Sequence, residues 1–168
     1  MEATFDKFLN DGSFWGMRAE YINPFLESAR MVMEQMMRVR PTIGQLAVKD
    51  VVFRDGHIWI QIGLKGQING DVIYGFNEQV ALRIVSVMMG GFALTEIDEI
   101  GRSAISELGN MISGNASTIF SSRGLMVEIT PPKVVNGSAQ PLIFARKALT
   151  VPLILEDLGQ MELQVLIL

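Results

Sequence analysis

Residues 95–124 carry the clearest hydrophobic periodicity in the chain. At 100° per residue, one broad arc is apolar; it consists of Ile97, Ala104, Ile105, Leu108, Ile112, Ala116 and Ile119. Thr95 is a suitable N-cap with Asp98 three residues later, and Arg123 followed by Gly124 is typical of a helix end. The pattern predicts a helix of about 28 residues, roughly 42 Å long, whose apolar arc faces the core.

The opposite face of this helix has an unusual composition. Solvated helix faces are usually rich in Lys, Glu, Arg and Gln. This face instead carries mostly short side chains, namely Ser103, Ser106, Glu107, Asn110, Ser113, Gly114, Ser117 and Ser121. Ser, Asn and Gly are poor helix formers, and Gly costs about 1 kcal/mol relative to Ala. We infer a face of low relief against which another surface docks. Glu107 and Asn110, three residues apart, project from it as neighbours.

A second long helix is indicated nearer the N-terminus. Asn23 is expected to cap it, with Pro24 at its first position, and it should run to about Arg38. Its apolar side comprises Phe25, Ala29, Val32, Met33, Met36 and Met37. Residues 1–18 are interpreted as an N-terminal extension of the domain.

Strand-like segments fill most of the remaining chain. The segment 161–167 alternates, with Met161, Leu163, Val165 and Ile167 on one face, which is typical of a sheet covered on that side by helices. A short helix is expected from its cap, Asn77, to about residue 89. The other expected strands are 45–48, 51–53, 58–62, 70–76, 126–130 and 142–150. Together these elements predict one α+β domain over residues 1–168. In it, an antiparallel sheet carries two long helices packed together on one face, plus the short helix.

Composition excludes several classes of function. The 168 residues contain 14 Lys and Arg against 18 Asp and Glu, without a basic cluster. Nucleic acid and membrane surfaces are therefore not expected as partners. The absence of cysteine excludes disulfides and thiol catalysis, and the one histidine, His57, is interpreted as part of a turn without a catalytic role. No signal sequence or spanning segment is apparent, so a cytoplasmic protein is expected.

One string of residues resembles a known family. Ser103, Glu107 and Asn110 are followed by Met-Ile-Ser-Gly-Asn at 111–115 and by prolines at 131 and 132. This string resembles the signature of the CheC/CheX chemotaxis phosphatases. The run Ile-Asn-Pro-Phe at 22–25 is also similar to CheX proteins, and the resemblance extends from about residue 20 to the end.

The same motif has a faint earlier copy at Asn23, Glu27 and Arg30. CheC-like proteins usually carry two copies and CheX-like proteins a single, later one. A guanidinium only donates hydrogen bonds and cannot accept one from a water. The earlier copy is therefore expected to be silent, with Glu27 and Arg30 forming an ordinary ion pair.

The resemblance implies a specific activity. The substrate would be the phosphorylated aspartate of a CheY-like response regulator, which itself holds Mg²⁺, so that this chain needs no cofactor or metal. Asn110 would position the attacking water, and Glu107 would bind the regulator's lysine. Residues expected to contribute to partner binding are Ser103, Ser106, Met111, Gly114 and Ser117. The resemblance also implies a homodimer.

Two alternatives remain open from the sequence. The chain could be a non-catalytic module of the same fold that binds response regulators or belongs to a flagellar switch. It could instead be a self-associating protein whose serine-rich helix face is a dimer contact. The sequence names neither the regulator nor the pathway.

Overall fold

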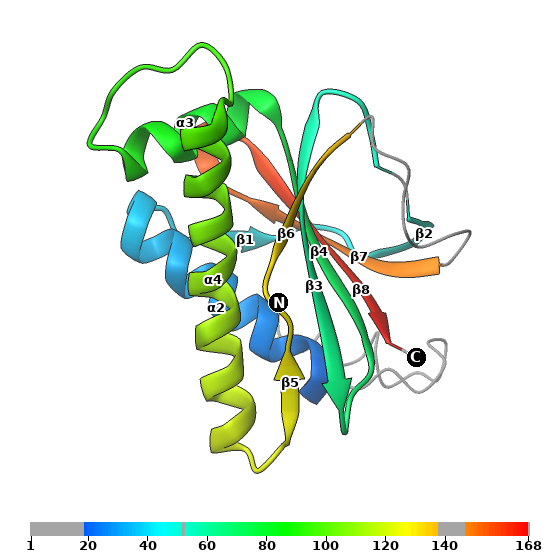
Figure 1. Cartoon of the computed structure of the whole chain (residues 1–168). Coiled ribbons are helices and arrows are strands. Elements are labelled where there is room, and N and C mark those ends of the chain that lie inside the picture. Colours follow the sequence, from blue (N-terminus) through cyan, green and yellow to red (C-terminus); the bar gives the residue numbers. More distant parts are fainter. Residues whose placement is uncertain (1–18, 52, 138–146, 168) are drawn as a thin grey trace.

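The computed structural model describes residues 19–51, 53–137 and 147–167, which form one sheet with helices on one face (Figure 1). The helices are α2 (Ala19–Met37), α3 (Glu78–Met88) and α4 (Glu99–Ser122). The strands are β1 (Thr42–Ile43), β2 (Ala47–Asp50), β3 (His57–Gly66), β4 (Gly70–Asn77), β5 (Val127–Ile129), β6 (Lys133–Asn136), β7 (Lys147–Ile154) and β8 (Gln160–Ile167). A short 3₁₀ turn, Glu156–Leu158, connects β7 to β8.

Every strand pair in the sheet is antiparallel. The order is β1-β7-β8-β4-β3-β5, with β2 also paired to β7 and β6 also paired to β3. In β8, Met161, Leu163 and Val165 are fully buried beneath the helices, while Ile167 is partly buried. The expected alternation in this strand is therefore confirmed, as is the α+β class.

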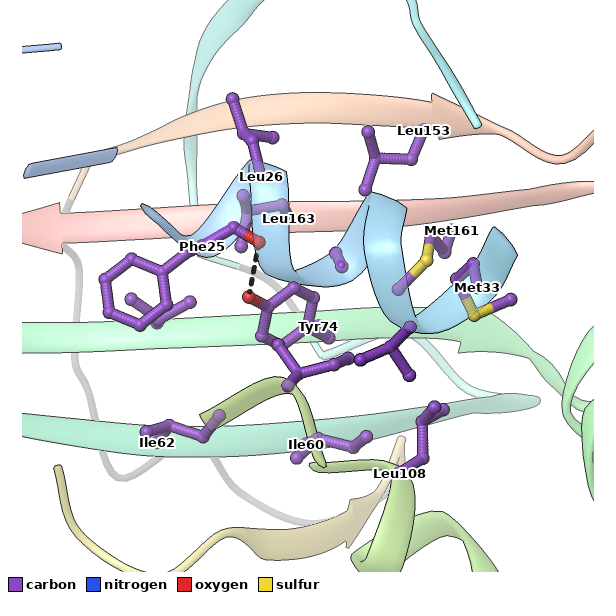
Figure 2. Close-up of a cluster of buried hydrophobic side chains, with 14 of the residues drawn as sticks. Phe25, Leu26, Met33, Ile60, Ile62, Tyr74, Leu108, Leu153, Met161 and Leu163 are labelled. Atoms are coloured by element: carbon purple, nitrogen blue, oxygen red, sulfur yellow. Dashed lines mark hydrogen bonds between the residues drawn. The ribbon is translucent and has the colours of Figure 1, made fainter. Parts of the chain in front are cut away.

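The α2 helix rests on the middle of the sheet. Figure 2 shows Phe25 and Met33 of α2 above Tyr74 of β4, with Ile60 and Ile62 of β3 beside it. The Tyr74 hydroxyl donates a hydrogen bond of 3.2 Å to the carbonyl oxygen of Phe25. This bond joins helix to sheet inside the core, and burial raises the pKa of the Tyr74 hydroxyl well above its usual value of 10.0.

The two long helices contact each other through aromatic packing. Phe25 of α2 and Phe120 of α4 meet edge to face, with ring centroids 5.4 Å apart. Both side chains are fully buried. The expectation of two long helices packed together on one face, with the short α3 beside them, is confirmed (Figure 1).

Both long helices begin elsewhere than the sequence suggested. The α2 helix starts at Ala19, so that Pro24 lies inside it and Asn23 is not its cap. The added first turn buries Ile22 completely, and this apolar burial outweighs the preference of proline for the first position. The α4 helix is capped by Asp98, whose carboxylate accepts a 2.8 Å hydrogen bond from the Gly101 amide, and not by Thr95.

The other helix ends agree with expectation. The α4 helix ends at Ser122 with Arg123 as its C-cap, followed by Gly124 in the left-handed region at φ 74°. The α3 helix is capped by Asn77, whose side chain accepts a 2.8 Å hydrogen bond from the Val80 amide. The α4 helix is 24 residues long, shorter than expected mainly because its cap lies three residues later, at Asp98.

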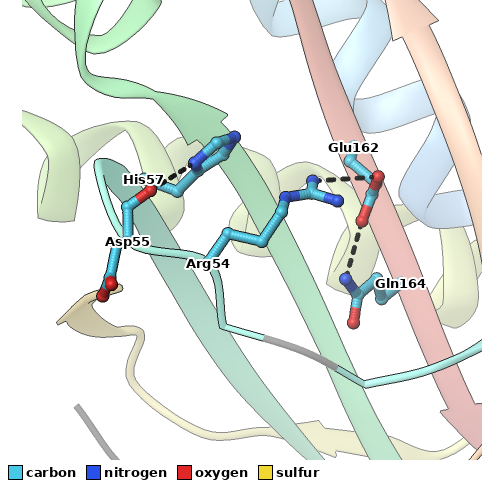
Figure 3. Close-up of polar contacts among 5 residues, drawn as sticks. All are labelled: Arg54, Asp55, His57, Glu162 and Gln164. Carbon is cyan, nitrogen blue, oxygen red and sulfur yellow. Dashed lines mark hydrogen bonds and ion pairs between the residues drawn. The ribbon is translucent and has the colours of Figure 1, made fainter. Parts of the chain in front are cut away.

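The face of the sheet away from the helices is also covered, which the sequence did not suggest. Val51 and Phe53, expected in a strand, lie outside any strand and pack on this face, where Phe53 meets Trp59 edge to face at 5.3 Å. Figure 3 shows Arg54 reaching from this segment to Glu162 of β8, with 3.3 Å between nitrogen and oxygen. Val51 and Phe53 are apolar because they cover the outer face of the sheet.

Polar groups accompany this outer cluster. Gln164 donates a 2.7 Å hydrogen bond to Glu162 (Figure 3). The Arg54 guanidinium also lies 5.6 Å from the centre of the Trp59 ring. His57, the first residue of β3, stacks on Trp59. The outer face thus combines apolar packing with an ion pair in which Glu162 is buried and Arg54 remains exposed to solvent.

Two short strands were not expected, and other boundaries shifted. The missed strands are β1 and β6, and β6 directly follows the proline pair at 131–132. The expected strands 45–48 and 142–150 appear as β2 and β7, and β7 continues to Ile154. Residues 142–146 and the extension 1–18 lie outside the described residues.

The Tyr74 hydroxyl predicts a dependence of stability on alkaline pH. Below about pH 10, both folded and unfolded Tyr74 are protonated, and the residue adds no pH dependence. Above it, the unfolded chain loses this proton while the folded chain retains it. The free energy of unfolding then falls by up to about 1.4 kcal/mol per pH unit from this residue.

Urea titrations between pH 8 and pH 11 would measure this effect. Tyr74→Phe should cost about 1 kcal/mol at pH 8 through loss of the hydrogen bond, and should lose stability less steeply above pH 10. Tyr21→Phe, which removes a tyrosine that is only partly buried, is the matched control. Equal alkaline slopes for wild type and Tyr74→Phe would contradict the prediction.

Candidate functional site

The seating of α4 on the sheet fixes which of its residues face solvent. Its inner side is fully buried along five positions, Ile105, Leu108, Ile112, Ala116 and Phe120. Gly109 lies between them against β3, where a Cβ atom would come within 2.9 Å of the Ile60 side chain and of the Pro132 ring. The helix can approach the sheet this closely only because Gly109 lacks a side chain.

Glu107 and Asn110 both lie on the exposed side of α4. Neither side chain makes a hydrogen bond or an ion pair with any residue that the structure describes. The pair therefore stands free, one helical turn apart, on a rigid element. Burial of these two groups, or permanent internal bonds to them, would have argued against a functional role.

The other residues expected to bind the partner surround this pair and are exposed or partly exposed. One further residue of the predicted polar face, Ser113, is not. Ser103 and Gly114 are exposed, while Ser106, Met111 and Ser117 are partly exposed. Ser113, expected on the polar face, is instead buried, and its hydroxyl donates a 2.7 Å hydrogen bond to the Gly109 carbonyl oxygen. A short hydroxyl that bonds its own helix backbone can be buried without an unsatisfied group, which explains the error.

The open surroundings of Gly114 distinguish it from Gly109. A Cβ atom at Gly114 would meet no other atom within 4 Å. The fold therefore does not require glycine at position 114, although it does at 109. We refer below to the exposed positions 103, 107, 110 and 114 together as the α4 stripe.

The earlier motif copy on α2 is arranged differently. Glu27 pairs with Arg123 at the end of α4, with 2.9 Å between nitrogen and oxygen. The expected Glu27–Arg30 ion pair is therefore wrong. The packing of Phe25 on Phe120 brings the end of α4 beside Glu27, so the cation 96 residues away replaces the one three residues away. This carboxylate takes part in a contact between the two helices, whereas Glu107 is free.

Two contributors to the site were missed in the sequence. Gly109 seats the helix, and Arg102 ties α4 to β6 through hydrogen bonds to the Asn136 side chain at 3.1 Å and the Val134 carbonyl oxygen at 3.2 Å. A glycine in the middle of the apolar arc was the available signal for Gly109. Arg102 gave no signal, because β6 itself was not expected.

The described residues offer little for metal chemistry. Within them, no three His, Asp or Glu side chains are placed to hold a metal ion together. None of the helices in this part of the chain has the length and apolar character required to cross a membrane. What the α4 stripe can do chemically is offer a carboxylate, an amide and a low surface to a docking partner.

The chain is similar to proteins of one family. The sequence profile of the family described as "Chemotaxis phosphatase CheX" matches residues 58–153. The CheY-P phosphatase CheX of Thermotoga maritima is 35% identical over 121 residues, covering 72% of this chain and 78% of that protein.

Solved structures agree with the sequence comparisons. The CheX of the CheX–CheY–BeF₃–Mg²⁺ complex from Borrelia burgdorferi is 27% identical with a TM-score of 0.73, covering 89% of this chain and 99% of that chain. A CheC-like superfamily protein from Shewanella is 26% identical with a TM-score of 0.75, covering 89% and 97%. These neighbours confirm the expected fold. Because the profile spans more than half of the sequence and the Thermotoga protein is similar over most of both chains, the chain belongs to the CheX family of chemotaxis phosphatases.

Proposed function

We propose that this protein hydrolyses the aspartyl phosphate of a CheY-like response regulator. The observation that carries the proposal is the free pair Glu107 and Asn110 on the exposed side of α4. The relative from Thermotoga maritima is named a CheY-P phosphatase, and the one from Borrelia burgdorferi was solved with CheY. Family and geometry therefore support the same reaction.

The chemistry required of this chain is positioning. An acyl phosphate already held by a metal ion and a lysine needs a water molecule aligned with the phosphorus. The Asn110 amide suits this task, since it can accept a hydrogen bond from the water and donate one to it. Mg²⁺ belongs to the regulator in this scheme, and this chain binds no cofactor of its own.

Glu107 has a different role in the proposal. Its carboxylate pairs with the active-site lysine of the regulator, which fixes the register in which the two surfaces dock. Ser103, Ser106, Met111 and Ser117 border the contact, and Gly114 lets the two backbones approach closely. The α2 copy stays silent, because Arg30 replaces the amide and Glu27 is paired with Arg123.

The alternatives make separate predictions. A non-catalytic binding module would bind a regulator without releasing phosphate, and the unengaged Asn110 amide favours catalysis over that reading. A self-associating protein would cover the α4 stripe in its dimer. We propose a cytoplasmic homodimer that leaves this stripe accessible; light scattering of wild type and of stripe variants would test that arrangement.

Replacement of Asn110 should remove catalysis and preserve docking. For Asn110→Ala, we expect stimulated phosphate release to fall at least about 100-fold, because the water loses its positioning group. Affinity for the regulator carrying BeF₃⁻ and Mg²⁺ should change by less than about threefold. Arg30→Ala, at the same motif position on α2, is the matched control and should retain activity. Unchanged turnover by Asn110→Ala would refute the water-positioning role.

Replacement of Glu107 should weaken docking. Glu107→Ala removes the partner of the regulator's lysine, and Glu107→Lys adds a repulsion, so we expect Kd to rise by about tenfold and by a larger factor, respectively. Isothermal titration would measure both. Glu27→Ala on α2 is the control and should leave the affinity unchanged. If both Glu107 variants bind as tightly as wild type, Glu107 lies outside the interface.

The two glycines of α4 should respond in opposite ways to alanine. Gly114→Ala should raise the free energy of unfolding by about 0.5–1 kcal/mol, because its Cβ meets open space and alanine favours the helix. Gly109→Ala should lower it by about 1–3 kcal/mol through overpacking. Urea unfolding measures both values.

The functional consequence separates folding from docking. We expect Gly114→Ala, although more stable, to raise the KM for the phosphorylated regulator, since the added methyl group occupies the contact surface. A variant that is more stable and fully active would show that Gly114 does not touch the partner.

A further inference from the structure

Ile100 is exposed at the start of the helix that carries the proposed catalytic pair. Its side chain is 60% exposed, and it is the one large exposed hydrophobic residue on α4, which lies wholly within the described residues. Position 100 is the second residue of the helix, where acidic and small polar side chains are favoured. Isoleucine there neither packs into the core nor supports the helix end.

Ile100 lies on the same side of α4 as Glu107. Seven residues separate the two, which is roughly two turns, so their side chains leave the helix within about 20° of each other and about 10 Å apart along the axis. Ser103 lies between them and is also exposed. Ile100 therefore extends the α4 stripe towards its N-terminal end.

An interface of ordinary size centred on the catalytic pair would include Ile100. A standard interface buries about 800 Å² on each partner, which corresponds to a patch roughly 16 Å in radius. A patch of that size centred on Glu107 and Asn110 includes residues 10 Å away on the same face. The partly exposed Met111, which follows Asn110 directly, supplies a second apolar contact beside the pair.

The charges around Ile100 indicate the chemistry of the complementary surface. Glu96 and Glu99 are exposed beside it, and Glu107 follows on the same stripe. The one basic residue of α4 itself, Arg102, donates its hydrogen bonds to Asn136 and Val134 on β6. This end of the helix is therefore apolar and acidic.

We propose that Ile100 is the apolar anchor by which this protein selects its response regulator. It enters an apolar depression on the receiver domain that is bordered by Lys or Arg, next to the phosphorylated aspartate. The inference rests on the proposed function, and it adds a selective contact that is separate from the catalytic pair. Loss of the anchor weakens docking but leaves the chemistry of the docked complex intact.

The test uses the full chain and a host receiver domain that the wild type dephosphorylates. Binding is measured with that domain carrying BeF₃⁻ and Mg²⁺, and turnover by phosphate release. Ile100→Ala should raise Kd and KM about tenfold, Ile100→Glu should raise them further, and kcat should stay within about twofold of wild type. Because the side chain is exposed, both variants should fold, which thermal unfolding would verify.

Matched controls come from the far end of the helix. Met126 is 79% exposed just beyond the end of α4, so Met126→Ala and Met126→Glu repeat the same changes away from the stripe and should bind as wild type does.

Glu99→Lys should weaken binding several-fold and reduce its salt dependence. Glu128→Lys, on β5, makes the same charge change at a distance and should not.

The outcomes separate the two proposals. If wild type releases phosphate from a receiver domain and the Ile100 variants bind it equally well, the anchor is overturned and the phosphatase stands. If the Ile100 variants change the proportion of dimer in light scattering without altering Kd, this face is a contact between copies, and the anchor is again overturned. If wild type acts on no host receiver domain, the proposed function fails, and the anchor fails with it.

Discussion

The structure depends on the close contact between the middle of α4 and strand β3. At Gly109, the helix backbone comes so near the Ile60 side chain and the Pro132 ring that a methyl group would not fit. This contact fixes the rotation of α4 about its axis. A turn of one residue, about 100°, would direct exposed polar groups toward the core, where an unpaired carboxylate is very costly. The exposure of Glu107 and Asn110 is thus a consequence of how the opposite side packs.

A second contact, between α2 and α4, explains why the two motif copies differ in the folded chain. Packing of Phe25 against Phe120 places the end of α4 beside α2, and Arg123 then takes the carboxylate of Glu27. The earlier copy contributes to the contact between helices, and the later copy remains available to a partner. A single free pair on one helix is what a CheX-like protein would require. The difference arises from tertiary packing, since the two glutamates occupy equivalent positions in the sequence.

Periodicity was sufficient to predict the elements that pack through one continuous face. The α4 core side, the β8 alternation and the α3 cap at Asn77 follow from local rules, and the structure agrees. The predicted start of α4 was wrong because Thr95 and Asp98 are both good caps, and the sequence alone does not decide between them. The start of α2 failed because burial of Ile22 outweighed the positional preference of Pro24.

Errors of another kind came from long-range contacts. The apolar run 51–53 satisfies the pattern of a strand, but the packing of Val51 and Phe53 around Trp59 depends on the sheet that they cover. Glu27 and Arg123 are 96 residues apart, so no local rule could pair them. For the candidate site, the sequence predicted the exposed polar pair from the short side chains on the same face of the helix. Its support through Gly109 and Arg102 was not, because both act on elements that only the folded chain brings together.

The composition of the α4 stripe links stability to function. Serine, asparagine and an uncrowded glycine on an exposed helix face all reduce helix stability, and the core provides no reason for Gly114. In the proposed reaction, the regulator supplies the metal ion, the lysine and the phosphoryl group, and this chain supplies one amide and one carboxylate. Because this chain supplies only part of the active site, its selectivity for the regulator must come from the surface around those two groups. A face with short side chains, held in one orientation by a rigid helix, meets that requirement. Apolar packing on the buried side of α4 compensates for the low helix propensity of this face.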